Sequence, residues 1–60
     1  MPPREILLEM TTIGNALRVV AIDAETGTEV TFQAPATTSR PTLERLAADK
    51  LRYVMGKRRG

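Results

Sequence analysis

The chain has 60 residues, enough for one small domain, and a core of that size usually needs a staple or a partner chain. It contains no cysteine and no histidine, which excludes disulfides, thiol chemistry, tetrahedral zinc sites and histidine-based catalysis. The net charge of +2 is too small to imply a polyanionic partner by itself, and 42% hydrophobic residues predict a folded chain.

Neither end of the chain predicts a membrane or secretory segment. The apolar runs are only a few residues long, and Met-Pro-Pro-Arg-Glu lacks the apolar core of a signal peptide. The carboxylates form no EF-hand pattern. We therefore expect a cytoplasmic protein with no membrane contact, no metal site and no cofactor.

The first half of the chain predicts three strands. Residues 1–4 are expected to form a flexible arm, because two consecutive prolines exclude regular pairing. Three β-prone runs follow, at residues 5–13, 16–23 and 28–34. Gly14-Asn15 between apolar runs is typical of a two-residue hairpin, because both residues tolerate positive φ. Residues 24–27 form the second connection.

The two hairpins predict a register that can be tested against itself. It places Met10 opposite Val19 and Val19 opposite Phe32, so both hairpins put the same middle-strand residues on one face. That face collects Ile6, Leu8, Met10, Leu17, Val19, Ala21, Val30, Phe32 and Ala34. A slip of one residue in either hairpin would bring polar residues onto it. The prediction is an antiparallel meander in the order 1-2-3.

The last third of the chain predicts an amphipathic helix. Ser39 is the expected N-cap, Pro41 lies in the first turn, and Gly56 is the expected stop. The apolar stripe consists of Leu43, Leu46, Ala47, Leu51 and Val54. The predicted fold class is α+β: a single β-β-β-α domain over residues 5–56, with the helix packed on one sheet face and a basic tail at 57–60.

The other sheet face predicts an interface. Leu7, Val20 and Ile22 are neighbours in the register and form an apolar centre within a charged rim. Exposed apolar patches tend to mark interaction sites, and both sheet edges are open as well. We therefore expect a homodimer, formed face to face, by edge pairing, or by exchange of the N-terminal strand or the helix.

Residues 23–27 combine two carboxylates with turn residues. Asp23 and Glu25 lie beside Thr26 and Gly27, a pattern that can serve acid–base catalysis or a tight turn. Catalysis needs a pocket, which a hairpin tip on so small a chain does not provide. We therefore predict a turn and no catalytic residue.

The basic C-terminus is a candidate contact for a polyanion. The residues are Arg52, Lys57, Arg58 and Arg59. They could contact phosphates, or they could be a solvated helix end favoured by the helix dipole. One Phe and one Tyr give no stacking platform for single-stranded nucleic acid, and no helix-turn-helix pair is present.

The order of "REILLEM", "IGNALRVVAIDAETGTEV", "APATTSR" and "LERLAADKLRYVM" resembles a family of short uncharacterised proteins of about 60 residues from alphaproteobacteria. The resemblance extends from about Arg4 to about Lys57 and implies a β-β-β-α unit with no established activity. Some members carry the label serine hydroxymethyltransferase. That label does not transfer, because the enzyme needs a pyridoxal phosphate lysine in a defined pocket.

These observations favour a small non-catalytic protein-interaction module that acts as a homodimer and binds an unidentified protein. The alternative is a nucleic-acid or ribonucleoprotein accessory protein that uses the basic helix end. An enzyme ranks third, because the chain lacks His and Cys and has little room for a pocket.

Overall fold

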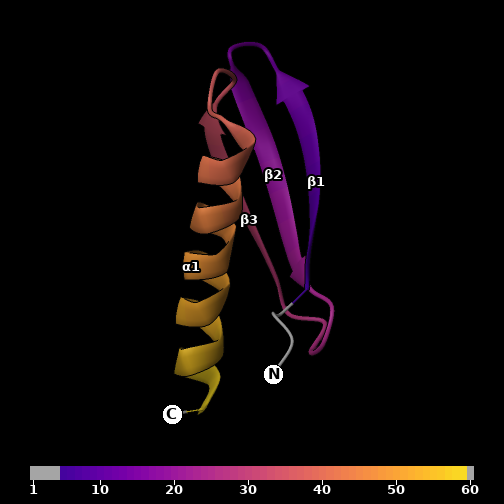
Figure 1. Cartoon of the computed structure of the whole chain (residues 1–60), viewed down its shortest axis with the longest axis vertical. Helices are drawn as coiled ribbons and strands as arrows, with labels where there is room; N and C mark the ends of the chain where they lie inside the picture. Colours follow the sequence, from indigo (N-terminus) through magenta and orange to yellow (C-terminus); the bar gives the residue numbers. More distant parts are fainter. Residues whose placement is uncertain (1–4, 60) are drawn as a thin grey trace.

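The structure, a computed structural model, describes residues 5–59 of the chain. The predicted flexible arm, residues 1–4, lies outside the described residues. Three strands and one helix form two layers, with the helix on one side of the sheet (Figure 1). The elements are β1 (Ile6–Ile13), β2 (Ala16–Asp23), β3 (Glu29–Pro35) and α1 (Arg40–Arg59).

The predicted meander and its register are confirmed. The strands pair antiparallel in the order β1-β2-β3. The predicted pairs that the structure contains include Leu8 with Ala21, Met10 with Val19, Val19 with Phe32, and Ala21 with Val30. Because side chains alternate between faces along a strand, this register gathers the apolar residues on one side, as predicted.

The two strand connections use positive φ at glycine. Gly14 has φ +58°, and Asn15 does not share this conformation, so the hairpin has the φ signs of a type II′ turn. The predicted two-residue hairpin is confirmed, and it uses positive φ only at Gly14, because a type II′ turn needs it only at the first turn residue. In the second connection Gly27 has φ +77°, and its N–H donates to the Asp23 carbonyl at 2.8 Å.

Helix α1 begins as predicted and ends later than predicted. The Ser39 carbonyl accepts the first helical hydrogen bond, from Leu43 N–H at 3.0 Å, and Ser39 Oγ accepts from Thr42 N–H at 3.4 Å. The stop predicted at Gly56 is wrong, because α1 continues to Arg59. One glycine costs a helix only about 1 kcal/mol relative to alanine, which good helix formers around it can offset.

The core lies between α1 and the predicted apolar face of the sheet. Its buried hydrophobic residues are Val19, Ala21, Ala34, Leu43, Ala47 and Leu51. Leu43 packs against both Val19 of β2 and Ala34 of β3. Ile6 and Leu8 of β1 are only partly buried against the core. The helix therefore covers β2 and β3 and leaves the β1 side of its sheet face partly open.

Candidate functional site

The outer face of the sheet, the face opposite α1, holds the three predicted interface residues. Leu7 lies directly opposite Ile22 in the β1–β2 register, and Val20 is the next residue of β2 on the same face. Leu7 is 50% exposed, while Val20 and Ile22 are half-buried. The structure thus brings the three side chains together in one surface, which we call the outer patch.

Ile13 is a further apolar residue of the outer face that the sequence reasoning missed. It is 55% exposed and pairs with Ala16, which in turn pairs with Pro35. Glu9 and Thr11 separate it from Leu7 along β1. Its position could have been predicted, because Ile13 and Leu7 are six residues apart and therefore share a face.

The charges of the molecule are divided between its two layers. Five of the seven Asp and Glu residues lie at or before Glu29, whereas seven of the nine Lys and Arg residues lie at or after Arg40. On the outer face, alternation places Glu9 beside Val20 and Glu29 opposite Ile22. Arg18 lies further along the same face of β2. The rim of the outer patch is therefore mainly acidic, and the helix is mainly basic.

The carboxylate of Asp23 belongs to the turn between β2 and β3. Asp23 is completely buried, and its Oδ2 lies 2.8 Å from Thr26 Oγ1, which donates to it. The Glu25 N–H donates to Asp23 Oδ1 at 3.4 Å, and the Thr28 N–H donates to Thr26 Oγ1 at 3.2 Å. These bonds organise the backbone of the connection, in agreement with the predicted turn.

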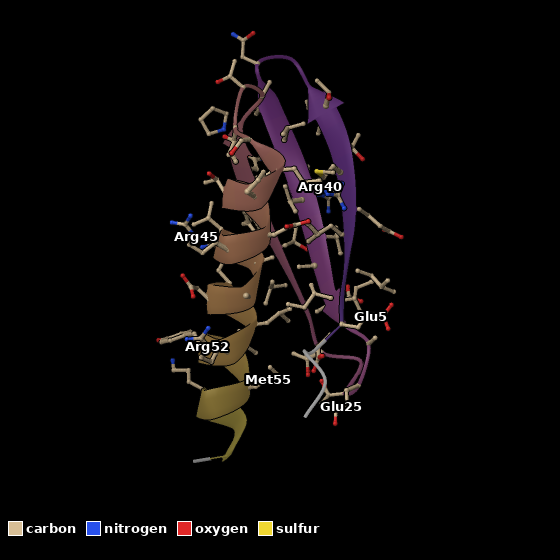
Figure 2. The ribbon with its side chains drawn as sticks, viewed as in Figure 1. Glu5, Glu25, Arg40, Arg45, Arg52 and Met55 are labelled. Atoms are coloured by element: carbon tan, nitrogen blue, oxygen red, sulfur yellow. The ribbon has the colours of Figure 1, made fainter. Side chains whose placement is uncertain are left out.

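The burial of Asp23 is a second feature that the sequence reasoning missed. Asp23 alternates with Val19 and Ala21 in β2, so its side chain lies on the helix side of the sheet. Thr26 Oγ1 also lies 3.8 Å from Met55 Sδ of α1, which links the turn to the helix. Glu25 and Met55 lie at the same end of the molecule (Figure 2).

The candidate polyanion residues lie on the C-terminal half of α1. Arg52 forms an exposed ion pair with Asp49 at 3.6 Å, and Lys57 Nζ lies 5.3 Å from the centre of the Tyr53 ring. Arg45 and Arg52 project from the side of α1 that faces away from the sheet (Figure 2). The side chains of Arg58 and Arg59 lie outside the described residues. The ion pair with Asp49 partly neutralises the basic surface.

Within residues 5–59, a groove lies on each side of α1. The groove beside β3 has a volume of about 450 Å³ and is lined by Val30, Thr31, Leu46, Asp49, Lys50, Tyr53 and Val54. The groove beside β1 has a volume of about 240 Å³ and is lined by Ile6, Leu8, Arg40 and Glu44. Arg40 and Glu44 form an ion pair at 3.2 Å in this second groove. The β3 groove is therefore the larger and the more apolar.

No three Asp, Glu, His or Cys side chains within residues 5–59 lie close enough together to hold a metal ion. Helix α1 is not apolar enough over a sufficient length to cross a bilayer.

The architecture defines a class of small two-layer α+β modules, in which a three-stranded meander carries one helix and exposes its other face. The chain belongs to the DUF6898 family, described as a domain of unknown function, whose sequence model matches residues 3–59. Neither a curated protein nor a solved structure matches the chain. The match confirms the expected membership of a family with no assigned activity, and the expected β-β-β-α unit is the one that the structure shows.

Proposed function

We propose that this chain is a small, non-catalytic protein-interaction module of the cytoplasm, which acts as a homodimer and binds a protein partner through its outer sheet face. One observation carries the proposal. Helix α1 covers a single face of the sheet, so Leu7, Val20 and Ile22 form an apolar centre on the uncovered face. Such patches on small proteins mark interaction sites.

The small core supports an association of this kind. Among the residues that the structure describes, three of the six buried hydrophobic residues are alanines, which contribute little apolar area. A domain of this size has a stability of only about 3–5 kcal/mol from its core. Burying one leucine side chain is worth about 1.5–3 kcal/mol, so covering the outer patch would add a large fraction to the total.

The charge around the outer patch defines the chemistry of the partner. Glu9 and Glu29 border the patch, and Glu5 precedes β1 at the same end. A complementary protein surface would place apolar side chains at its centre and lysine or arginine side chains at its rim. Such charge complementarity accelerates association and makes it sensitive to salt.

The test is the double variant Leu7→Glu plus Val20→Glu, with crosslinking capture of partners from the native cell. The variant should lose the captured partners while its circular dichroism spectrum remains that of the parent. The matched control is Ala36→Glu plus Thr37→Glu, which adds the same charge at two exposed loop positions. If the double variant captures the same partners and self-associates unchanged, the proposal is wrong.

The alternative is a nucleic-acid accessory function. It is supported by the seven cationic residues at or after Arg40 and by the continuation of α1 to Arg59, which orders the last basic residues on a helix. Deletion of residues 57–60 should then abolish binding to heparin or RNA, and the binding should fall steeply with salt. A flat binding curve at low salt would eliminate this alternative.

A further inference from the structure

We infer that the homodimer forms through the edge of β3, where a second copy continues the sheet and the β3 grooves of the two copies close over one another. The inference rests on the proposed function for the expectation of a homodimer. It adds which strand edge forms the dimer interface, the register between the two β3 strands, and the residues that meet across the interface. The outer patch remains available to a different protein partner.

The hydrogen bonding of β3 shows which backbone groups are available. The Asp23 N–H donates to the Thr28 carbonyl at 2.8 Å, and the Ala36 N–H donates to the Asn15 carbonyl at 2.9 Å. In an antiparallel pair the bonded residues alternate, so Val30, Phe32 and Ala34 bond to β2. The alternate residues Glu29, Thr31 and Gln33 therefore direct their backbone N–H and C=O groups away from β2, toward the open edge of the sheet.

A two-fold axis at Thr31 uses this edge fully. Thr31 then pairs with Thr31 of the second copy, and Glu29 pairs with Gln33 of the second copy, which gives six backbone hydrogen bonds. On the outer face the Glu29 carboxylate would accept from the Gln33 amide. Shifting the register by two residues brings Glu29 opposite Pro35, which has no N–H. The opposite shift leaves Gln33 without a strand residue to pair with.

The position of α1 over the sheet suits this arrangement. Leu43 packs against both Val19 and Ala34, so α1 lies above the space between β2 and β3. Neighbouring strands are about 4.8 Å apart, so pairing through β3 would place the two helix axes about 10 Å apart. Packed helices have axes about 8–10 Å apart. Pairing through β3 thus brings the two helices to packing distance.

Across this axis, the residues that line the β3 groove of one copy are complementary to those of the second copy. Lys50 Nζ lies 5.4 Å from the centre of the Phe32 ring, and both Lys50 and Thr31 line the β3 groove, so Lys50 is level with the axis. The two helices run antiparallel, which brings Asp49 toward Lys50 of the second copy. The same symmetry brings Tyr53, 65% exposed in one chain, toward Leu46 of the second copy. Opposite charges and apolar side chains thus meet at the same time.

The edge of β1 suits a second copy less well. Pairing through β1 would place the helix axes about 19 Å apart, four strand spacings, and would leave an open trough above the joined strands. On that side the Arg40–Glu44 ion pair already lies over Ile6 and Leu8. The larger and more apolar groove is at β3.

The inferred dimer would carry both outer patches on one side of a six-stranded sheet. The two copies of Val20 would be separated by three strand spacings, about 14 Å. A partner protein would therefore meet two apolar patches side by side, and not one isolated patch.

The inference can be tested by sedimentation velocity at tens of micromolar protein, with Thr31→Pro and its matched control Thr12→Pro. Thr31→Pro removes an edge N–H of β3 and leaves the β2 ladder intact, which is tolerated in edge strands. In β1 the Ala24 N–H bonds to the Glu5 carbonyl at 3.0 Å, so alternation directs the Thr12 N–H toward the β1 edge. We expect a dimeric parent, a dimeric Thr12→Pro variant and at least a tenfold weaker dimer for Thr31→Pro.

A second variant guards against a loss of folding in the proline variant. Tyr53→Glu changes a side chain that is largely exposed in one chain, so the fold should survive, while the dimer should again weaken at least tenfold. A parent that is monomeric, or a dimer that dissociates only with Thr12→Pro or with Leu7→Glu plus Val20→Glu, overturns the inference. Partner capture that is lost in the Leu7 and Val20 double variant would still support the outer patch, so the two proposals fail separately.

Discussion

Val19 and Val20 are neighbours in β2, yet they lie on opposite faces of the sheet. Val19 is fully buried under α1, whereas Val20 is half-buried in the outer patch, on a face that no described element covers. The two faces are built from alternate residues of the same strands and both have apolar centres. What separates core from surface in this fold is therefore the side on which the single helix lies, and not the residue type.

The largest difference between the faces should appear in leucine truncation. Leu51 is 1% exposed, so Leu51→Ala should cost about 2–5 kcal/mol, comparable to the whole stability of so small a domain. Leu7→Ala on the outer face should cost less than about 1 kcal/mol. Urea unfolding followed by circular dichroism, at one protein concentration, measures both. Equal losses would mean that the outer face is as tightly packed as the core.

Substituting each of the adjacent valines by threonine compares the two faces more sharply, because threonine has nearly the same shape as valine. Val19→Thr buries a hydroxyl and should destabilise the domain by about 1–3 kcal/mol. Val20→Thr places the same hydroxyl at a half-exposed position and should change the stability by less than about 0.5 kcal/mol. The measurement is the urea midpoint of each variant. A larger loss from Val20→Thr than from Val19→Thr would contradict the assignment of the faces.

The register between β2 and β3 determines which side chains lie on each face, and it depends on the turn before β3. Gly27→Val places a β-branched residue at φ +77° and should cost about 1–2 kcal/mol, although no atom lies within 4 Å of the added Cβ. Gly27→Asn is the control, because asparagine tolerates this conformation better. Thermal unfolding measures both. A valine variant with the parent's stability and spectrum would show that the turn does not need positive φ at this position.

The smallest expected effect concerns the helix that covers the inner face. Gly56 lies inside α1, and no atom lies within 4 Å of a Cβ added there. Gly56→Ala should therefore stabilise the domain by up to about 1 kcal/mol. Thermal unfolding and helical circular dichroism measure the gain. A loss of stability would instead support the helix end that the sequence predicts at Gly56.

Much of the fold could be predicted from the sequence, because the alternation of apolar residues predicts the same face of the middle strand for both hairpins and so defines one register. The N-cap at Ser39 was predictable for a similar local reason, since its hydroxyl can accept a bond from a first-turn N–H. The outer patch followed from the same register, because Leu7 and Ile22 are direct neighbours in it.

The features that were not predicted depend on contacts beyond the local pattern. Gly56 has a low helix propensity, but the penalty is small, and α1 passes through it. Asp23 is predicted at the end of the second strand as a turn residue, and its turn role is confirmed, but its burial is not predicted: the strand carries its carboxylate into a buried position where Thr26 supplies a hydrogen bond. A carboxylate with such a donor can remain in the interior, which a pattern of polar and apolar residues does not indicate.

The order of the elements along the chain also determines how the domain is completed during synthesis. Each hairpin joins strands that are adjacent in sequence, so the three strands can pair early and quickly. Helix α1 is made last, and until residues 40–59 are available the apolar face that it covers remains bare. A nascent chain that stalls before Arg40 would expose apolar side chains on both faces of the sheet. It would be a natural substrate for chaperones and a source of aggregation.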